Sequence, residues 1–129
     1  MADELSRILF VEDEETIAIV AIMTLEDIGG FEVKHCTSGE EAVLALPDFK
    51  PQLVLTDMMM PGMDGIETFK KIRELPDGKD IPVIFMTAKA QKHEQEDYIS
   101  IGAAGVVPKP FDPMTVCDTI RELWKNSKS

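Results

Sequence analysis

The sequence predicts an α/β protein in which five short strands form one parallel sheet between two layers of helices. Three observations predict this class. Short apolar runs alternate along the chain with longer segments of helical periodicity. Four of these runs end directly in polar side chains, and such sheets bind ligands beyond the carboxyl ends of their strands. Pro108 falls in the last run, which suits an edge strand and not a central one.

The expected strands are short apolar runs of the kind found in buried parallel sheets. They cover residues 7–11, 31–36, 53–56, 83–86 and 106–108. An edge position for Pro108 fits the strand order 2-1-3-4-5, which is the order of a flavodoxin-like (βα)5 three-layer sandwich. In that order the first and third strands are adjacent, so Asp13 and Asp57 become neighbours.

The first two expected helices begin and end at recognisable residues. One covers residues 14–28 and stops at Gly29, because glycine accepts the backbone conformation that ends a helix. The next begins after Ser38, which can form a capping box with Glu41, and ends before Pro47.

The remaining helices are expected at residues 66–75, 92–101 and 113–125. Asp112 caps the last of them, and Pro113 occupies its first position. The helix at 92–101 is polar and has only Tyr98, Ile99 and Ile101 as apolar anchors. We therefore expect it to be among the least stable parts of the fold.

The first helix is unusually apolar. Its core-facing stripe is expected to contain Ile17, Val20, Ala21, Leu25 and Ile28. Another group then falls on the opposite side, next to Glu26, and consists of Ile19, Ile22 and Met23. Two interpretations remain open: scattered surface apolar residues, which are common, and a docking patch for a partner protein.

The composition describes one globular domain spanning residues 1–129. Its net charge of −11 argues against nucleic acid as a direct partner, because phosphate binding needs a basic surface. The longest apolar run, at 17–23, is too short to span a membrane, and the N-terminus has no signal-peptide pattern. Cys36 and Cys117 match no metal spacing, so we expect reduced thiols and a cytoplasmic location.

The acidic residues at the strand ends favour a magnesium site. Mg²⁺ prefers oxygen ligands, keeps several waters and takes one or two carboxylates. We assign Asp13 and Asp57 as direct ligands, Glu12 as a water-mediated ligand and the backbone carbonyl of Met59 as a further protein ligand.

A carboxylate at such a site can also act as a nucleophile toward phosphorus. Asp57 would then form an acyl phosphate, while Lys109 supplies a cation and Thr87 a hydroxyl group to the phosphoryl oxygens. Each of these residues alone is weak evidence. Their combination, in this order on an alternating scaffold, is strong evidence.

These residues resemble the receiver domain of the bacterial response-regulator family. The resemblance extends over nearly the whole chain, which is close in length to the single-domain chemotaxis type. The long motif after the third strand is highly specific. In chain order, the matching segments are Glu12-Asp13, Asp57-Met58-Met59-Met60-Pro61-Gly62-Met63-Asp64-Gly65, Thr87-Ala88 and Lys109-Pro110-Phe111.

The resemblance implies that Asp57 accepts a phosphoryl group from a histidine kinase or a histidine phosphotransfer protein in a two-component phosphorelay. It implies Mg²⁺ as cofactor, Glu12 and Asp13 as the acidic pair, Thr87 as the switch hydroxyl and Lys109 as the phosphoryl-contacting lysine. Such a domain catalyses only its own phosphorylation and dephosphorylation, and it signals through contacts with a downstream protein target. The Lys109-Pro110 bond is expected to be cis.

Three positions bear on this expectation. The family often has an aromatic residue at the switch position three before the lysine, where this chain has Val106. We therefore expect the helix at 92–101, and not a ring rotation, to carry the signal. In the family, the residues at the positions of Met59 and Lys89 tune how fast the phosphoryl group is lost to water. A long cation at Lys89 could reach over the site, but we favour the interpretation that its side chain faces solvent.

Several alternatives stay open. A magnesium-dependent phosphohydrolase would need Asp-x-Asp after the first strand, where this chain has Glu12-Asp13-Glu14-Glu15. A nucleotide module would need a phosphate-binding loop at the same place, and this acidic run would repel phosphate. The chain ends just after its last helix, so we expect output through protein contacts or a relay; it can also be a piece of a longer protein. His35 and His93 have no ligand partner at a recognisable spacing and are interpreted as packing or surface residues.

Overall fold

The computed structural model describes residues 4–88 and 91–127, and its core is one parallel sheet in the order β2-β1-β3-β4-β5. The strands are β1 (Arg7–Val11), β2 (Glu32–Cys36), β3 (Leu53–Asp57), β4 (Val83–Thr87) and β5 (Gly105–Pro108). This order confirms the fold class and the edge position of Pro108.

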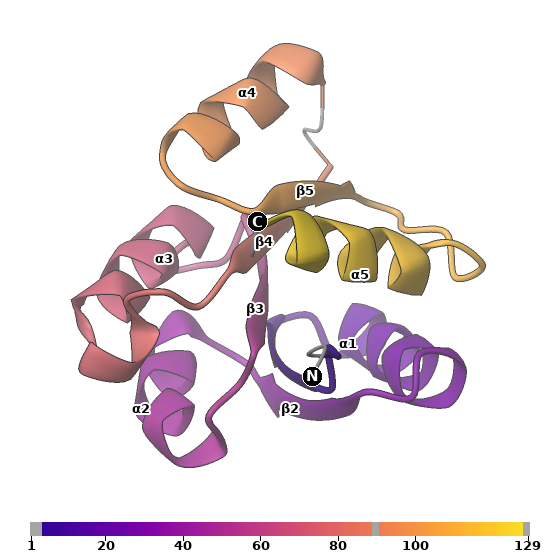
Figure 1. Ribbon diagram of the computed structural model, residues 1–129, viewed down its shortest axis with the longest axis horizontal. Coiled ribbons are helices and arrows are strands. Elements are labelled where there is room, and N and C mark those ends of the chain that lie inside the picture. Colours follow the sequence, from indigo (N-terminus) through magenta and orange to yellow (C-terminus); the bar gives the residue numbers. More distant parts are fainter. Residues whose placement is uncertain (1–3, 89–90, 128–129) are drawn as a thin grey trace.

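Helices cover both faces of the sheet (Figure 1). One face is covered by α1 (Glu15–Met23) and α5 (Val116–Ser127), and the other by α2 (Gly39–Phe49) and α3 (Gly65–Glu74). The fifth helix, α4 (Lys92–Ser100), lies beside the edge strand β5 and contributes no buried residue. A short 3₁₀ turn, η2 (Pro76–Gly78), follows α3.

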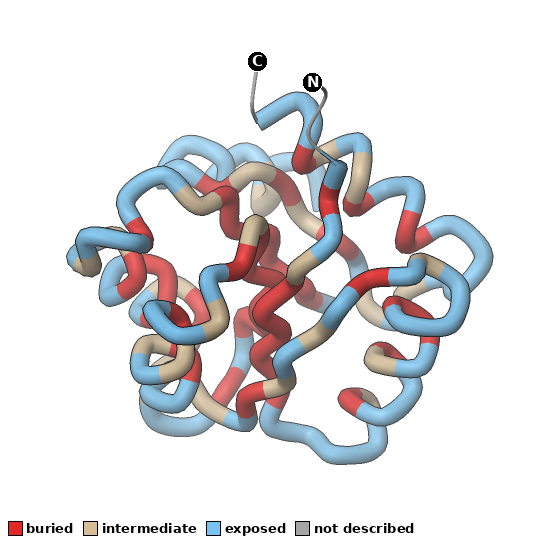
Figure 2. The backbone as a smooth tube through the Cα atoms, turned by 60° about the horizontal axis from the view of Figure 1, so that its bottom comes forward, coloured by how far each residue is buried: buried red, intermediate tan, exposed pale blue. Residues whose placement is uncertain are grey.

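The sheet separates two apolar cores, which form the buried centre of the molecule in Figure 2. Alternate strand residues such as Phe10, Leu55 and Ile84 face α1 and α5. Their neighbours, such as Val54 and Phe85, face α2 and α3. Both faces are buried, so the strands read as continuous apolar runs and not as an alternating pattern.

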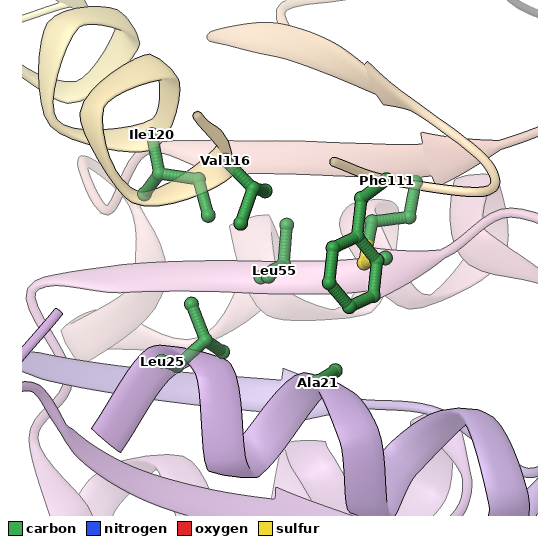
Figure 3. Close-up of a pocket in the computed structure, with 7 residues that line it drawn as sticks. Ala21, Leu25, Leu55, Phe111, Val116 and Ile120 are labelled. Carbon is green, nitrogen blue, oxygen red and sulfur yellow. The ribbon is translucent and has the colours of Figure 1, made fainter. Parts of the chain in front are cut away.

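Figure 3 shows a small cavity between α1, α5 and the sheet. Its volume is about 10 Å³, and all of its lining is apolar, so it offers no hydrogen-bond partner to a water molecule. The labelled lining residues are Ala21, Leu25, Leu55, Phe111, Val116 and Ile120. Phe111 therefore anchors the segment after Lys109 to the core between α1 and α5.

The first helix corrects one prediction. Its last turn is a π-helix, η1 (Thr24–Ile28), whose wider turn changes which side chains face the core. Two residues predicted to be in the core stripe are exposed: Ile28 within this turn (58%) and Val20 in the regular helix before it (48%). Ala18 is buried instead, and Ile22 packs partly against the core.

The second helix corrects another prediction, because it continues past Pro47 to Phe49. Proline removes one hydrogen bond, but here it lies in the last turn, where little helix remains to be disrupted. The turn closes with a hydrogen bond from the Lys50 N–H to the Leu46 carbonyl. Arg7 stabilises it further by lying over the Phe49 ring and donating to the Phe49 carbonyl.

The predicted caps are present at both Ser38 and Asp112. The Ser38 hydroxyl accepts the Glu41 N–H, although the Glu41 carboxylate turns to Thr37 and so does not complete the capping box. The Asp112 carboxylate accepts the N–H of Met114, while regular α5 begins later, at Val116. Within the described residues, no helix is long and apolar enough to cross a membrane.

Candidate functional site at the carboxyl edge of the sheet

The five-stranded order brings the predicted polar residues together at one edge. Glu12 and Asp13 follow β1, Asp57 is the last residue of the neighbouring strand β3, and carboxylate oxygens of all three lie within 4.8 Å of one another. Thr87 ends β4 next to β3, and Lys109 follows β5. The predicted convergence is therefore what the structure shows.

Glu12 is almost completely buried, and its polar groups are held on several sides. Its N–H donates to the Cys36 carbonyl at 3.0 Å, and its Oε2 accepts the Glu14 N–H at 3.1 Å. Its own carbonyl lies 2.9 Å from Nε2 of His35. Burial, with a smaller contribution from the Asp57 charge, raises the pKa of Glu12 to about 7, against the opposing effects of Glu14 and Lys109.

Lys109 bridges two of the carboxylates. Its Nζ lies 3.0 Å from Oε1 of Glu12 and 2.9 Å from Oδ1 of Asp57. Burial alone would lower the pKa of Lys109, but its hydrogen bonds to Asp57 and Glu12 raise it. The backbone N–H of Lys109 donates to the Thr87 carbonyl, and the Lys109-Pro110 bond is cis, as expected.

The donor set fits a divalent cation. Lys109 can balance only one of the three negative charges on Glu12, Asp13 and Asp57. Among the described residues, buried Oε1 of Glu12 is contacted by a single partner, the Lys109 ammonium group at 3.0 Å. Asp13 is exposed, which leaves the cluster open to an ion from solution. Hard oxygen ligands with unbalanced charge are what Mg²⁺ requires.

The loop after Asp57 is held close to this cluster. The Met58 N–H donates to the Met86 carbonyl, and the Gly65 N–H returns to the Met58 carbonyl. A side chain at Gly65 would come within 2.7 Å of the Asp57 carbonyl, so only glycine fits there. The side chain of Met59 is two-thirds exposed.

The switch residues occupy different surroundings. Thr87 is buried at the end of β4, while Val106 is half-buried in β5 and pairs in register with Phe85. The side chain of Phe85 contacts the ring of Tyr98 on α4, with the ring centroids 5.6 Å apart. Lys89 lies outside the described residues.

An apolar groove of about 480 Å³ borders the cluster on the side of α1. Lys109 forms part of its lining, and the same side chain contacts the carboxylates of Glu12 and Asp57. Its other lining residues come from α1 and from the segments after β4 and β5: Thr16, Ile17, Val20, Ala88, Pro110, Phe111 and Pro113.

His35 is the site residue that the sequence did not reveal. Its spacing matches no ligand pattern, and the sequence suggested only packing. Its significance depends on the pairing of β2 with β1, which places the His35 ring beside Phe10 and against the Glu12 carbonyl.

The fold and this edge cluster define an α/β module with a carboxylate site suited to phosphoryl chemistry. Residues 8–121 match the response regulator receiver domain, so the chain belongs to this family of two-component signalling proteins. The resemblance noticed in the motifs is therefore confirmed.

Relatives and solved structures agree with this assignment. The chain is 32% identical over 124 residues to the phosphate regulon transcriptional regulatory protein PhoB of Rhizobium meliloti, covering 96% of this chain and 54% of that protein. It is also 32% identical to the alkaline phosphatase synthesis transcriptional regulatory protein PhoP of Bacillus subtilis, covering 95% and 50%. The chain thus spans about half the length of the curated relatives it matches.

Two solved structures are similar over nearly their full length. The chemotaxis protein CheY4 of Vibrio cholerae has a TM-score of 0.84 and 28% identity, covering 92% of this chain and 98% of that chain. The receiver domain of a sensor histidine kinase from Pseudomonas aeruginosa has a TM-score of 0.78 and 26% identity, covering 99% and 100%. That structure has a magnesium ion coordinated in its active site cleft.

Proposed function

We propose that Asp57 accepts a phosphoryl group from a phosphohistidine, borne by a histidine kinase or a histidine phosphotransfer protein. The observation that carries this proposal is the buried Asp57 carboxylate, which lies 2.9 Å from Lys109 Nζ and within reach of Glu12 and Asp13. A carboxylate held in this way is oriented for attack, and the acidic pair beside it can hold a cation.

The reaction exchanges one bond to phosphorus for another. An Asp57 carboxylate oxygen attacks phosphorus, the new P–O bond forms as the P–N bond of the phosphohistidine breaks, and the imidazole nitrogen takes a proton from solvent. Lys109 turns its ammonium group from the Asp57 carboxylate to the phosphoryl oxygens. Thr87, at the end of the adjacent strand, contributes its hydroxyl group.

Glu12, Asp13, Asp57 and the Met59 backbone carbonyl are the residues that we expect to hold Mg²⁺. When bound, the ion neutralises charge on the phosphoryl oxygens as they approach the acidic cluster. Since the phosphoryl group is attached to the chain's own Asp57, the protein is a switch that modifies itself and not an enzyme with a turned-over substrate.

The docking surface for the donor is the face of α1 that borders the apolar groove. Val20 is half exposed there, and Ile19 and Met23 add further exposed apolar area on the same helix. Ile22, which the sequence offered as part of a docking patch, packs partly against the core and is a poor probe of docking. A four-helix donor placed on this face would bring its phosphohistidine toward Lys109 and Asp57.

Intact-mass analysis with acetyl phosphate tests the chemistry without a protein donor. The wild type with Mg²⁺ should gain one phosphoryl group per chain, with acetate as the leaving group. Asp57→Asn should gain none, while Asp48→Asn, an exposed site on α2, should behave as the wild type. Equal labelling of Asp57→Asn, or multiple turnovers of a phosphomonoester in its place, would overturn the proposal.

Four further expectations drawn from the sequence stay predictions. They concern the downstream protein target, the absence of nucleic-acid contacts by this chain, its cytoplasmic location and its organisation as a single receiver domain.

A further inference from the structure

We propose that His35 is a positioning residue for the acidic pair, acting through the hydrogen bond from its Nε2–H to the Glu12 carbonyl. This inference rests on the proposed function, because it assigns His35 to the cation-binding cluster of that same site. His35 touches neither the cation nor the reacting atoms. It holds the backbone from which Glu12 and Asp13 project.

The first observation is how completely β2 holds Glu12. The β1–β2 pairing ends at Val11 and Cys36, and the Glu12 N–H extends it by donating to the Cys36 carbonyl at 3.0 Å. The next backbone group is the Glu12 carbonyl, to which no backbone N–H of the described residues donates. The His35 side chain reaches it instead, at 2.9 Å.

The second observation is that Glu12 is held both by its side chain and by its backbone. Lys109 contacts its carboxylate from the interior of the site, and Glu14 contacts the other carboxylate oxygen. His35 contacts its backbone carbonyl, and His35 also lines a groove together with Asp13 and Ile22. The carboxylate and the peptide plane are therefore fixed independently, and the peptide plane also sets the direction of Asp13.

The third observation is that the ring itself is well placed. It packs against Phe10, its register partner in β1, with ring centroids 5.7 Å apart and an angle of 33° between the planes. This contact fixes the ring orientation so that Nε2 faces the carbonyl. Since a carbonyl can only accept, Nε2 carries the hydrogen.

A purely structural histidine would also pack against Phe10, so the test must separate packing from hydrogen bonding. Glutamine can place its side-chain N–H₂ near the position of Nε2, whereas asparagine is too short and leucine has no donor. We would compare His35→Gln, His35→Asn and His35→Leu. His93→Leu on the exposed face of α4 serves as the control, because these are the two histidines of the chain.

The measurement is the affinity for Mg²⁺ alone, by isothermal titration at pH 7.5, with the urea-unfolding free energy recorded for each variant. We expect affinity to fall about threefold to tenfold in His35→Asn and His35→Leu, the range that one lost hydrogen bond produces. His35→Gln should stay within about twofold of the wild type, and His93→Leu should match it.

The outcomes separate the two proposals. Equal Mg²⁺ affinity in all four variants, or an equal loss in Gln, Asn and Leu, would overturn the role of the hydrogen bond. A loss of stability without a change in affinity would make His35 a packing residue only. If the wild type binds no Mg²⁺, the proposed function itself fails. If His35→Leu does not fold, the comparison of Gln with Asn still decides.

Discussion

At the scale of single residues, the site concentrates more negative charge than its lysine balances. Glu12 and Asp57 both contact Lys109 Nζ, while Asp13 lies exposed beside them. Burial makes the charged form of Glu12 costly and raises its pKa to about 7. A cation that bound this cluster would relieve that cost, so the unfavourable charge favours the proposed metal binding.

This raised pKa predicts how stability depends on pH without metal. Between the ordinary pKa of Glu12, 4.5, and its folded value of about 7, the folded protein retains a proton that the unfolded chain releases. The free energy of unfolding should therefore fall as pH rises from 5 to 8, by on the order of 3 kcal/mol for this group. Urea unfolding in EDTA measures it.

Glu12→Gln is the matched control, because it keeps the shape and removes the titration. Its unfolding free energy should change much less than that of the wild type over the same pH range. Adding Mg²⁺ to the wild type should reduce the pH dependence, because the ion stabilises the ionised form. Parallel profiles for the two proteins would contradict the assignment of the raised pKa to Glu12.

At the scale of elements, α4 is the helix that is attached most loosely. Figure 1 shows it beside β5, away from the other helices, and none of its residues is buried. Its main apolar attachment is Tyr98, whose ring contacts Phe85, two residues before Thr87 in the same strand. Movement of Thr87 toward a phosphoryl group can therefore affect α4 through the strand.

We predict that α4 responds most strongly to a phosphoryl mimic. Amide hydrogen exchange across α4 should change when beryllium fluoride and Mg²⁺ are added, while exchange across α5 changes little. Tyr98→Ala should raise α4 exchange even without the mimic, because it removes the ring contact with Phe85. Ile99→Ala, at an exposed neighbour, is the control. Unchanged α4 exchange with the mimic would contradict this prediction.

The elements also show what the sequence could and could not predict. Short apolar runs and the edge proline predicted the strands, their order and the convergence of Glu12, Asp13, Asp57 and Lys109. The core face of the first helix was predicted poorly, because α1 is apolar on nearly all sides and gives little periodic signal. A π-turn then shifts its last residues.

Tertiary contacts explain the other differences. The sequence ends the second helix at Pro47, but contacts of Arg7 with Phe49 keep its last turn helical. His35 carries no motif at all, because its contact with Glu12 arises only when β2 pairs with β1. Long-range pairing of this kind is not encoded in local spacing.

At the scale of the whole molecule, the site opens beside an apolar face on a strongly acidic protein. The net charge is −11, and the groove next to Lys109 is lined by apolar residues of α1 and of the segment after β5. A donor protein of the proposed kind would therefore meet apolar area near the site. It must also tolerate or complement the surrounding acidic surface.

This arrangement predicts a separation of two activities. Val20→Asp should slow transfer from a phosphohistidine protein about tenfold or more, since a charge there disrupts an apolar contact. It should leave labelling by acetyl phosphate unchanged, because the acidic cluster is intact. Leu44→Asp, on the exposed face of α2, should affect neither rate. Equal loss of both rates in Val20→Asp would place its effect on the fold and not on docking.

The location of the phosphoryl group tests the central claim most directly. Borohydride reduces an aspartyl phosphate to homoserine, so peptide mass mapping after acetyl phosphate, Mg²⁺ and borohydride identifies the residue that carried it. We predict homoserine at position 57 and at no other aspartate, with none formed in EDTA. Homoserine at position 13, or a phosphoryl group recovered on His35 or His93, would contradict the claim that Asp57 is the acceptor.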